Sequence, residues 1–109
     1  ANAGIHGLAG GDMNGSTVAG AEEWVHLALT VSDTVATIYL NGQAERSRTF
    51  STPLTMILGS GCIGAWNNKG DIQRELNGKM DDVRIYNRAV SEPELFWLAG
   101  KRAPVHKPF

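Results

Sequence analysis

Residues 76–98, LNGKMDDVRIYNRAVSEPELFWL, constrain the fold more than any other part of the sequence. Asn77-Gly78 is a turn dipeptide, because both residues tolerate positive φ. Residues 80–86 follow with strand character, since this segment ends in valine, arginine, isoleucine and tyrosine. The stretch therefore predicts a turn and a strand, after which residues 87–90 lead the chain away from the sheet.

The same stretch contains the signals of a helix. Ser91 and Glu94 have the S-x-x-E spacing of a capping box, in which two side chains satisfy free N–H groups at a helix start. Pro93 falls in the first turn, where its missing N–H costs little. Gly100 is placed to end the helix. We therefore expect one short helix that begins after Ser91.

Three segments of the sequence match a known pattern, in order. Residues 77–95, NGKMDDVRIYNRAVSEPEL, resemble the closing signature of the laminin-G-like, concanavalin-A-like jelly-roll domains and, more distantly, of the pentraxins. Residues 24–30, WVHLALT, resemble the W-x-H-x-A strand of the family, and residues 38–42, IYLNG, resemble its I-Y-V-N-G hairpin end. The resemblance implies an all-β, antiparallel jelly-roll β-sandwich that is truncated and has one short C-terminal helix.

Size and charge restrict the function further. A chain of 109 residues holds one domain at most, and 42% hydrophobic residues with 13 glycines indicate a turn-rich globular fold. Ten basic and eleven acidic residues leave a net charge of −1, so neither nucleic acid nor an anionic membrane is an expected partner. Cys62 is the only cysteine, so no internal disulfide forms, and we expect it to be buried beside Ile63.

Strand signals surround Asn41-Gly42, the strongest short hairpin signal in the chain. In residues 24–31 and 34–40, successive side chains fall on two alternating faces, as they do in paired strands. The more apolar face of the first strand, which we expect to face the core, contains Val25, Leu27, Leu29 and Val31. Residues 43–50 form a polar strand that suits a sheet edge, because charge discourages pairing with another edge.

The strand at residues 80–86 contains one break in its alternation. Met80 and Val83 are three residues apart, so a flat strand does not turn both to one face. One solution is a β-bulge near Asp81-Asp82, and the other is an ion pair of Asp82 with Arg84 on one face. We favour the ion pair, because the resemblance implies a packed sandwich in which such a pair is satisfied.

Residues 65–75, AWNNKGDIQRE, form the longest polar segment without a clear period. We expect a functional loop here, after short strands at residues 54–58 and 62–64. The distant pentraxin resemblance implies a calcium loop at this position, and the candidate ligands are Asn68, Asp71 and Glu75. The acidic run of the pentraxins falls on residues 66–68, which contain no carboxylate, so an ordinary solvated loop is the alternative.

Trp66 is the more specific indication of a binding site in this segment. An aromatic face stacks on the C–H face of a pyranose, and amides bond to hydroxyl groups in pairs. The candidate ligand-binding residues are therefore Trp66, Asn67, Asn68 and Asp71. The alternative is that Trp66 packs down onto the sandwich.

No acidic pair in the sequence has the arrangement of a glycosidase dyad. Asp81 and Asp82 are adjacent, and adjacent strand residues point to opposite faces unless the strand is bulged. Glu92 and Glu94 are explained by the helix start. The three histidines lack the spacing of metal ligands: His6, His26 and His106. We therefore expect no enzymatic activity.

The resemblance implies a non-catalytic extracellular module that binds a glycan or a protein, as part of a larger secreted protein. A structural or assembly domain without its own ligand is the first alternative, and a small glycan hydrolase is the least favoured. No cofactor is expected apart from the calcium candidate.

Few strand signals precede residue 24, in contrast to the family that the chain resembles. We expect a partial laminin-G-like β-sandwich at residues 1–100, which lacks the early strands, and a tail or linker at residues 101–109. A two-sheet sandwich must cover both inner faces and its strand edges. We therefore expect the missing strands to come from another polypeptide or from a homo-oligomer.

Overall fold

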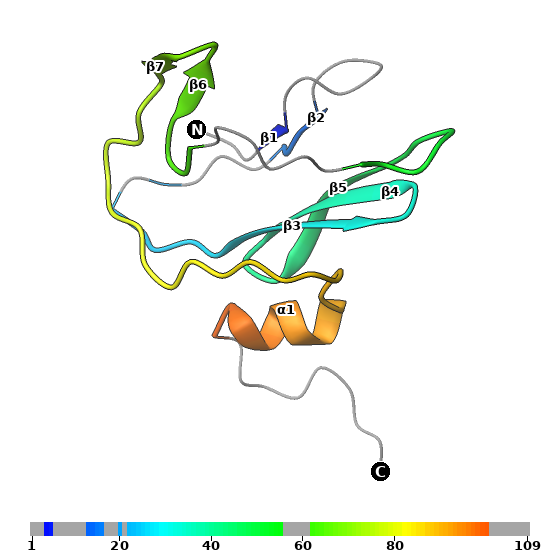
Figure 1. Cartoon of the computed structure of the whole chain (residues 1–109). Helices are drawn as coiled ribbons and strands as arrows, with labels where there is room; N and C mark the ends of the chain where they lie inside the picture. Colours follow the sequence, from blue (N-terminus) through cyan, green and yellow to red (C-terminus); the bar gives the residue numbers. More distant parts are fainter. Residues whose placement is uncertain (1–3, 6–12, 17–19, 21, 56–61, 101–109) are drawn as a thin grey trace. The chain divides into compact units, whose positions relative to one another are not determined.

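The computed structural model describes residues 4–5, 13–16, 20, 22–55 and 62–100. The chain divides into two compact units, one made of Ala1–Leu54 with Tyr86–Phe109 and the other of Thr55–Ile85 (Figure 1). The described elements are short antiparallel strand pairs and sheets with one short helix, so the expected all-β class is confirmed. The tail expected at residues 101–109 lies outside the described residues, as do His6 and His106.

A three-stranded antiparallel sheet forms the centre of the first unit. Its strands are β3 (Leu27–Ser32), β4 (Val35–Leu40) and β5 (Gln43–Thr49), in the order β3-β4-β5. Asn41 and Gly42 join β4 to β5 with φ angles of 51° and 81°. Positive φ at both central residues is the geometry of a type I′ turn, so the hairpin expected at Asn41-Gly42 is confirmed.

Gly42 is required for a second reason besides its φ angle. The residue is buried, and a Cβ built on it lies 2.8 Å from the Cα of Phe96, which belongs to helix α1 (Glu92–Leu98). A side chain would have to displace helix backbone at this distance. Only glycine therefore fits both the turn and the close approach of α1.

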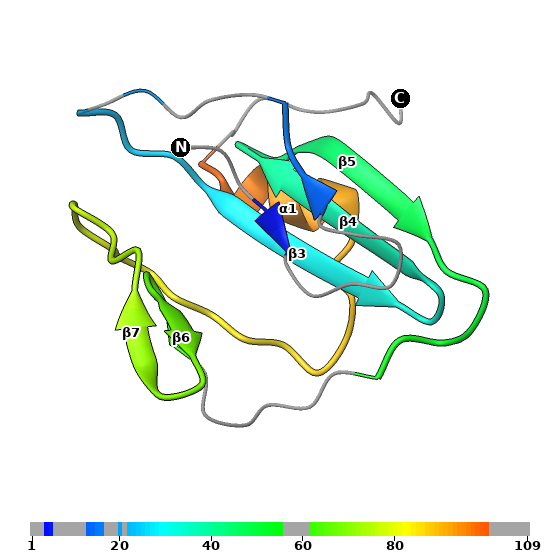
Figure 2. The ribbon, with the colours of Figure 1, turned by 90° about the horizontal axis from the view of Figure 1, so that it is seen from above.

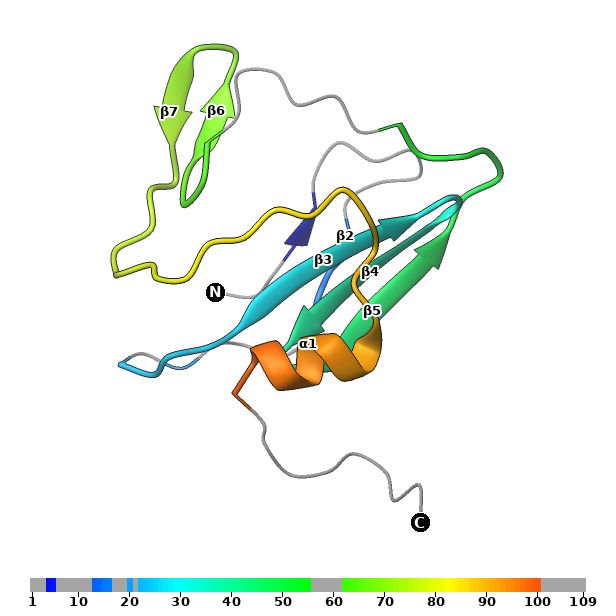
Figure 3. The same ribbon diagram turned by 60° about the horizontal axis from the view of Figure 1, so that its bottom comes forward.

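The sheet has a different partner on each face. The hairpin of β1 (Gly4–Ile5) with β2 (Met13–Asn14) lies over one face, and α1 lies over the other (Figures 1 and 2). Figure 3 shows α1 against β5, with which it is in contact. Between β2 and the sheet, the buried core consists of Met13, Ala36 and Ile38. On the helix side, Leu95 and Val90 are buried.

β5 is an edge strand, as its polar sequence predicts. The register shifts between Ile38 and Tyr39 of β4, which leaves Glu45 on β5 as the extra residue of a β-bulge. The guanidinium of Arg46 donates a 3.2 Å hydrogen bond to the backbone carbonyl of Asn14. Charged side chains and a bulge therefore protect this edge together.

The expectation that the apolar face of β3 packs into the core is wrong for most of that face. Leu27 is 54% exposed and Leu29 is 45% exposed, whereas Val31 packs against the core. Because residues paired across strands share a face, Leu27 and Leu29 lie on the same face as Ile38. The core cluster on this face joins Met13 to Ala36 and Ile38, and Val31 packs against that cluster.

The strand expected at residues 80–86 is absent from the structure. No strand of the described residues pairs with this segment, and its residue Asp82 has a φ of 58°, which interrupts an extended strand. The apolar side chains of the segment are exposed, with Ile85 at 77%. A strand needs a partner for its N–H and C=O groups, and the described part of the chain provides none here.

Two further strand predictions are wrong for those of their residues that the structure describes. Residues 54–55 and 62–64 are not in strands, whereas residues 56–58 lie outside the described part of the chain. Cys62 and Ile63 are exposed, so the expected burial of Cys62 is also wrong. Both segments lack a partner strand among the described residues, and without one an apolar side chain has no layer to pack against.

The strands of the second unit are β6 (Trp66–Asn68) and β7 (Asp71–Gln73), which pair antiparallel. Leu76 donates a backbone hydrogen bond of 2.6 Å to Gly64, which ties together the two ends of the segment around this hairpin. In the part of the chain that the structure describes, α1 is the only helix, and it is neither long nor apolar enough to cross a bilayer.

Candidate functional site

The hairpin of β6 and β7 stands where the sequence predicts a loop, at residues 65–75. Lys69 and Gly70 form its two-residue turn with φ angles of 53° and 96°, so both are positive, as in a type I′ turn. The side-chain oxygen of Asn67 accepts a 2.7 Å hydrogen bond from the Gly70 N–H. The loop prediction is wrong because Lys-Gly is a weaker turn signal than Asn-Gly, which left the two short strands unrecognised.

The register of this hairpin decides which side chains share a face. The pairs are Trp66 with Gln73, Asn67 with Ile72, and Asn68 with Asp71. Side chains alternate along a strand and paired residues share a side, so one face holds Trp66, Asn68, Asp71 and Gln73. Three of the four candidate ligand residues are brought together, and Gln73 joins them. The fourth candidate, Asn67, belongs to the opposite face.

Trp66 is held at the surface rather than in a core. Its side chain is 42% exposed. The guanidinium carbon of Arg74 lies 4.8 Å from the centre of the Trp66 ring, which is a cation–π contact. Arg74 follows β7 directly and has a φ of 56°, so the chain bends where this contact forms. The contact restrains the indole and occupies one of its two faces.

The calcium candidates occupy two positions around the hairpin. Asn68 and Asp71 are directly paired, whereas Glu75 lies two residues beyond the end of β7 and is exposed. The Asp71 carboxylate accepts a hydrogen bond from the side-chain amide of Gln73. In the described residues, no group of three or more His, Cys, Asp and Glu side chains is placed to hold a metal ion. Calcium takes roughly six to eight oxygen ligands, so a calcium site here stays a prediction.

The ion pair favoured by the sequence at the alternation break is present. The guanidinium of Arg84 lies 3.0 Å from the Asp82 carboxylate, and both side chains are exposed. The Asp82 N–H donates a 2.8 Å hydrogen bond to Asp81 Oδ1, and the positive φ of Asp82 adds a kink to the backbone. The two aspartates are thus engaged in local contacts.

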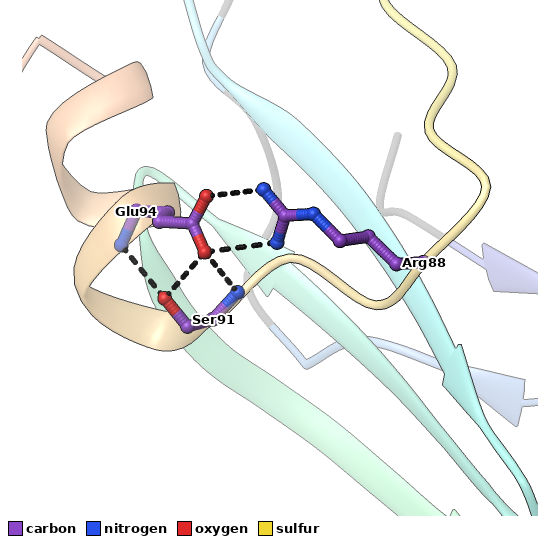
Figure 4. A network of polar contacts seen from close by, with 3 residues as sticks. All are labelled: Arg88, Ser91 and Glu94. Atoms are coloured by element: carbon purple, nitrogen blue, oxygen red, sulfur yellow. Dashed lines mark hydrogen bonds and ion pairs between the residues drawn. The ribbon is translucent and has the colours of Figure 1, made fainter.

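Arg88, Ser91 and Glu94 form a polar network at the start of α1 (Figure 4). Arg88 donates two hydrogen bonds to the Glu94 carboxylate, at 3.0 and 2.7 Å. The Ser91 hydroxyl accepts a hydrogen bond from the Glu94 N–H, and the Ser91 N–H donates to the Glu94 carboxylate, which completes the capping box. The predicted helix start is confirmed, as are Pro93 in the first turn and Gly100 directly after the C-cap residue Ala99.

The network changes the acidity of Glu94. Hydrogen bonds from Arg88, and then from Ser91, lower the pKa of Glu94 to about 2, because they stabilise its ionised form. The same contact raises the pKa of Arg88. A glycosidase general acid needs a carboxyl group whose pKa is raised. Glu94 is therefore a structural carboxylate that holds the helix start.

A shallow, open hollow lies beside α1, and no sequence motif indicated it. Its lining residues are Tyr86, Pro93, Glu94, Trp97 and Leu98. Four of them come from the helix at i, i+4 spacings, which place them on a common side. This spacing is the signal in the sequence that could have indicated the hollow. In α1, only Leu95 is buried.

The family of the chain follows from comparison with known sequences. Residues 4–96 match the laminin-G-like family described as the concanavalin A-like lectin/glucanases superfamily. The chain belongs to this family. The match confirms the resemblance carried by residues 24–98 and the all-β class, and a laminin-G-like domain of this kind is a binding or structural module. Comparison with curated proteins gives no match.

This laminin-G-like domain is also similar to a solved structure. A crystal structure of an S-layer domain-containing protein from Clostridium thermocellum matches it with a TM-score of 0.62 and 30% sequence identity. The match covers 84% of this chain and 46% of that chain. The chain therefore spans less than half the length of the structure that it matches.

Proposed function

We propose that this laminin-G-like domain is a non-catalytic module that binds glycans in an extracellular protein. The observation that carries the proposal is the shared hairpin face of Trp66, Asn68, Asp71 and Gln73. An indole, two amides and a carboxylate supply the two contacts that a sugar needs. The ring meets the C–H face of a pyranose, and the polar groups bond its hydroxyls.

Arg74 contributes to this proposal by restraining the indole. Its guanidinium lies against one face of Trp66, so the ring loses little further freedom when a ligand binds. The pyranose stacks on the opposite face of the indole, and the amides of Asn68 and Gln73 bond its hydroxyl groups. The hydrogen bond from Gln73 to Asp71 orients both side chains for that role.

The carboxylates outside the hairpin support the non-catalytic part of the proposal. Asp82 is paired with Arg84, and the pKa of Glu94 is lowered to about 2. A carboxyl group with a pKa as low as that of Glu94 is a poor proton donor to a glycosidic oxygen near neutral pH.

The similar solved structure supports the extracellular location. Its protein is described as S-layer domain-containing, which is consistent with a place at a cell surface. Because the match covers 46% of that chain, we take from it only a location and a module type, and no ligand.

Titration with a panel of soluble oligosaccharides and polysaccharides, followed by calorimetry, tests the proposal. Trp66→Ala should abolish binding while leaving the unfolding midpoint nearly unchanged, because the side chain is exposed. Trp24→Ala is the matched control, since Trp24 is 69% exposed and lies in the other unit. Glycan binding that survives Trp66→Ala, or that Trp24→Ala removes equally, would exclude the hairpin as the site.

Repeating the titration with calcium and with a chelator tests the metal candidates separately. Binding that needs calcium and that Asp71→Asn removes would support a role for Asn68 and Asp71 as ligands. Binding that is equal in calcium and chelator would leave these two residues as direct contacts to sugar hydroxyls.

A second candidate function, assembly with another polypeptide, has its own observation. Leu27 and Leu29 are exposed on a sheet face whose neighbouring residues form the core. Sandwich sheets cover such a face with a second layer, and an uncovered one marks an interaction surface. In this candidate function, strands from another polypeptide or a second copy of the chain complete the sheets.

A further inference from the structure

The outer edge of β3 presents a regular row of backbone hydrogen-bonding groups. The Asn41 N–H donates a 2.8 Å hydrogen bond to the carbonyl of His26, directly before β3. In an antiparallel pair the residues alternate between those bonded to the neighbouring strand and those directed away from it. Counting from His26 along the register, the β3 residues whose N–H and C=O groups face outward are Leu27, Leu29 and Val31.

This edge has none of the features that protect β5. The β3 sequence LALTVS contains no charge and no proline, whereas β5 carries Glu45, Arg46 and Arg48 together with a bulge. Among the described strands, β3 pairs with β4 alone. An uncharged, regular edge of this kind is a template for a further strand.

The side chains on this edge point to the same conclusion as the backbone. Leu27 and Leu29 are about half exposed, and they share a face with Val31 and the buried Ile38. A strand added next to β3 would place its own side chains opposite these residues. It would therefore satisfy the backbone groups and bring apolar side chains into lateral contact with the leucines.

We propose that β3 pairs with β3 of a second copy of this chain, antiparallel, around a two-fold axis at Leu29. In this register Leu29 faces Leu29 of the other copy, and Leu27 faces Val31 in both directions. All three outward-facing residues are then hydrogen-bonded, because the row is symmetric about its middle member. The two sheets join into one sheet with a continuous row of leucine and valine on one face.

The choice of a second copy rests on this self-complementarity. The row has an odd number of outward-facing residues with apolar side chains at every position, so no register conflict or charge repulsion arises in a symmetric pair. Pairing of two β5 edges would instead bring the arginines of both copies together. The proposal deepens the assembly candidate, and it is independent of glycan binding by the β6–β7 hairpin.

Light scattering with charge variants at Leu29 tests both the partner and the register. The wild-type chain should have twice the mass of one chain at micromolar concentration. In Leu29→Lys or in Leu29→Glu, two like charges meet at the axis, so the dissociation constant should rise roughly tenfold or more. An equimolar mixture of the two variants should restore the dimer, because lysine then faces glutamate. Thr49→Lys, which adds a charge to the edge strand β5, is the matched control and should leave the dimer intact.

Amide hydrogen exchange distinguishes the remaining outcomes. The N–H groups of Leu27, Leu29 and Val31 should exchange more slowly as the chain concentration rises, whereas those of Ala28 and Thr30, bonded to β4, should not change. A monomeric wild type, or a dimer that persists in both charge variants, overturns the proposal. If these N–H groups stay unprotected at every chain concentration, assembly through a second copy of the chain fails as well.

Discussion

The two halves of residues 76–98 have similarly clear sequence signals, but only one half forms the expected element. The helix half builds its cap from residues close in sequence, since Ser91 and Arg88 reach Glu94 across three and six positions. The strand half, residues 80–86, forms no strand with any described residue. A helix end is satisfied by its own neighbours, whereas a strand depends on a separate segment.

The same contrast separates two strands of the central sheet. β4 is paired on both sides, and its Ile38 is buried, whereas β3 is paired on one side and exposes Leu27 and Leu29. Both strands have apolar alternating sequences. What differs is the number of neighbours, so an apolar strand sequence predicts burial only where its partners are present.

Replacing each of two isoleucines by alanine tests this contrast and has the largest expected effect on stability. Ile38 is 3% exposed in the core, and Ile85 is exposed in the unpaired segment. Ile38→Ala should lower the free energy of unfolding by about 2–5 kcal/mol, because it removes buried methylene groups and leaves a cavity. Ile85→Ala should lower it by less than about 0.5 kcal/mol. Urea denaturation measures both, and equal losses would show that residues 80–86 pack against a partner in solution.

Alanine at two turn glycines compares a crowded turn with an open one. Gly42 and Gly70 both have positive φ, but only at Gly42 would a Cβ meet backbone, at Phe96. Gly70→Ala should lower stability by about 1 kcal/mol through backbone strain alone. Gly42→Ala should lower it by about 2–4 kcal/mol, because α1 must also move. Thermal unfolding of the two variants checks the order, and a smaller loss for Gly42→Ala would mean that α1 is not docked on this turn.

The predictable part of the fold is the part that short-range chemistry determines. Asn41-Gly42 gave a correct turn, Ser91 a correct helix start, and the polar composition of β5 a correct sheet edge. The family pattern over residues 24–98 supplied the all-β class. Two of the errors, the burial expected on β3 and the strand expected at residues 80–86, depend on segments that are distant in sequence or absent from the described residues.

In the candidate site, residue type could be predicted from the sequence, but side-chain orientation could not. Trp66, Asn68 and Asp71 were recognisable from residue type, but the opposite orientation of Asn67 was not. That orientation follows from the register of β6 with β7, and a shift of one residue would reverse every assignment. The contact of Arg74 with Trp66 depends in addition on a positive φ, for which arginine gives no sequence signal.

Removing the helix cap tests whether residues close in sequence hold the start of α1. Ser91→Ala should lower the free energy of unfolding by about 1 kcal/mol, because the Glu94 N–H loses its acceptor. Ser51→Ala, at an exposed position outside any helix or strand, is the matched control and should have almost no effect. Differential scanning calorimetry measures the change, and an unchanged midpoint in Ser91→Ala would mean that the start of α1 is held by packing alone.

The smallest expected effect is the pH dependence of the same network. The pKa of Glu94 is lowered from 4.5 to about 2 in the folded chain, so the ionised form stabilises the fold. A carboxyl group with a lowered folded pKa contributes its full stabilisation above its unfolded pKa and loses it as the pH falls through the folded pKa. The unfolding midpoint should therefore fall between about pH 5 and pH 2 more steeply in the wild type than in Glu94→Gln. Because the network is exposed, added salt should narrow the difference, and identical profiles for the wild type and Glu94→Gln would show that the contact with Arg88 does not persist in solution.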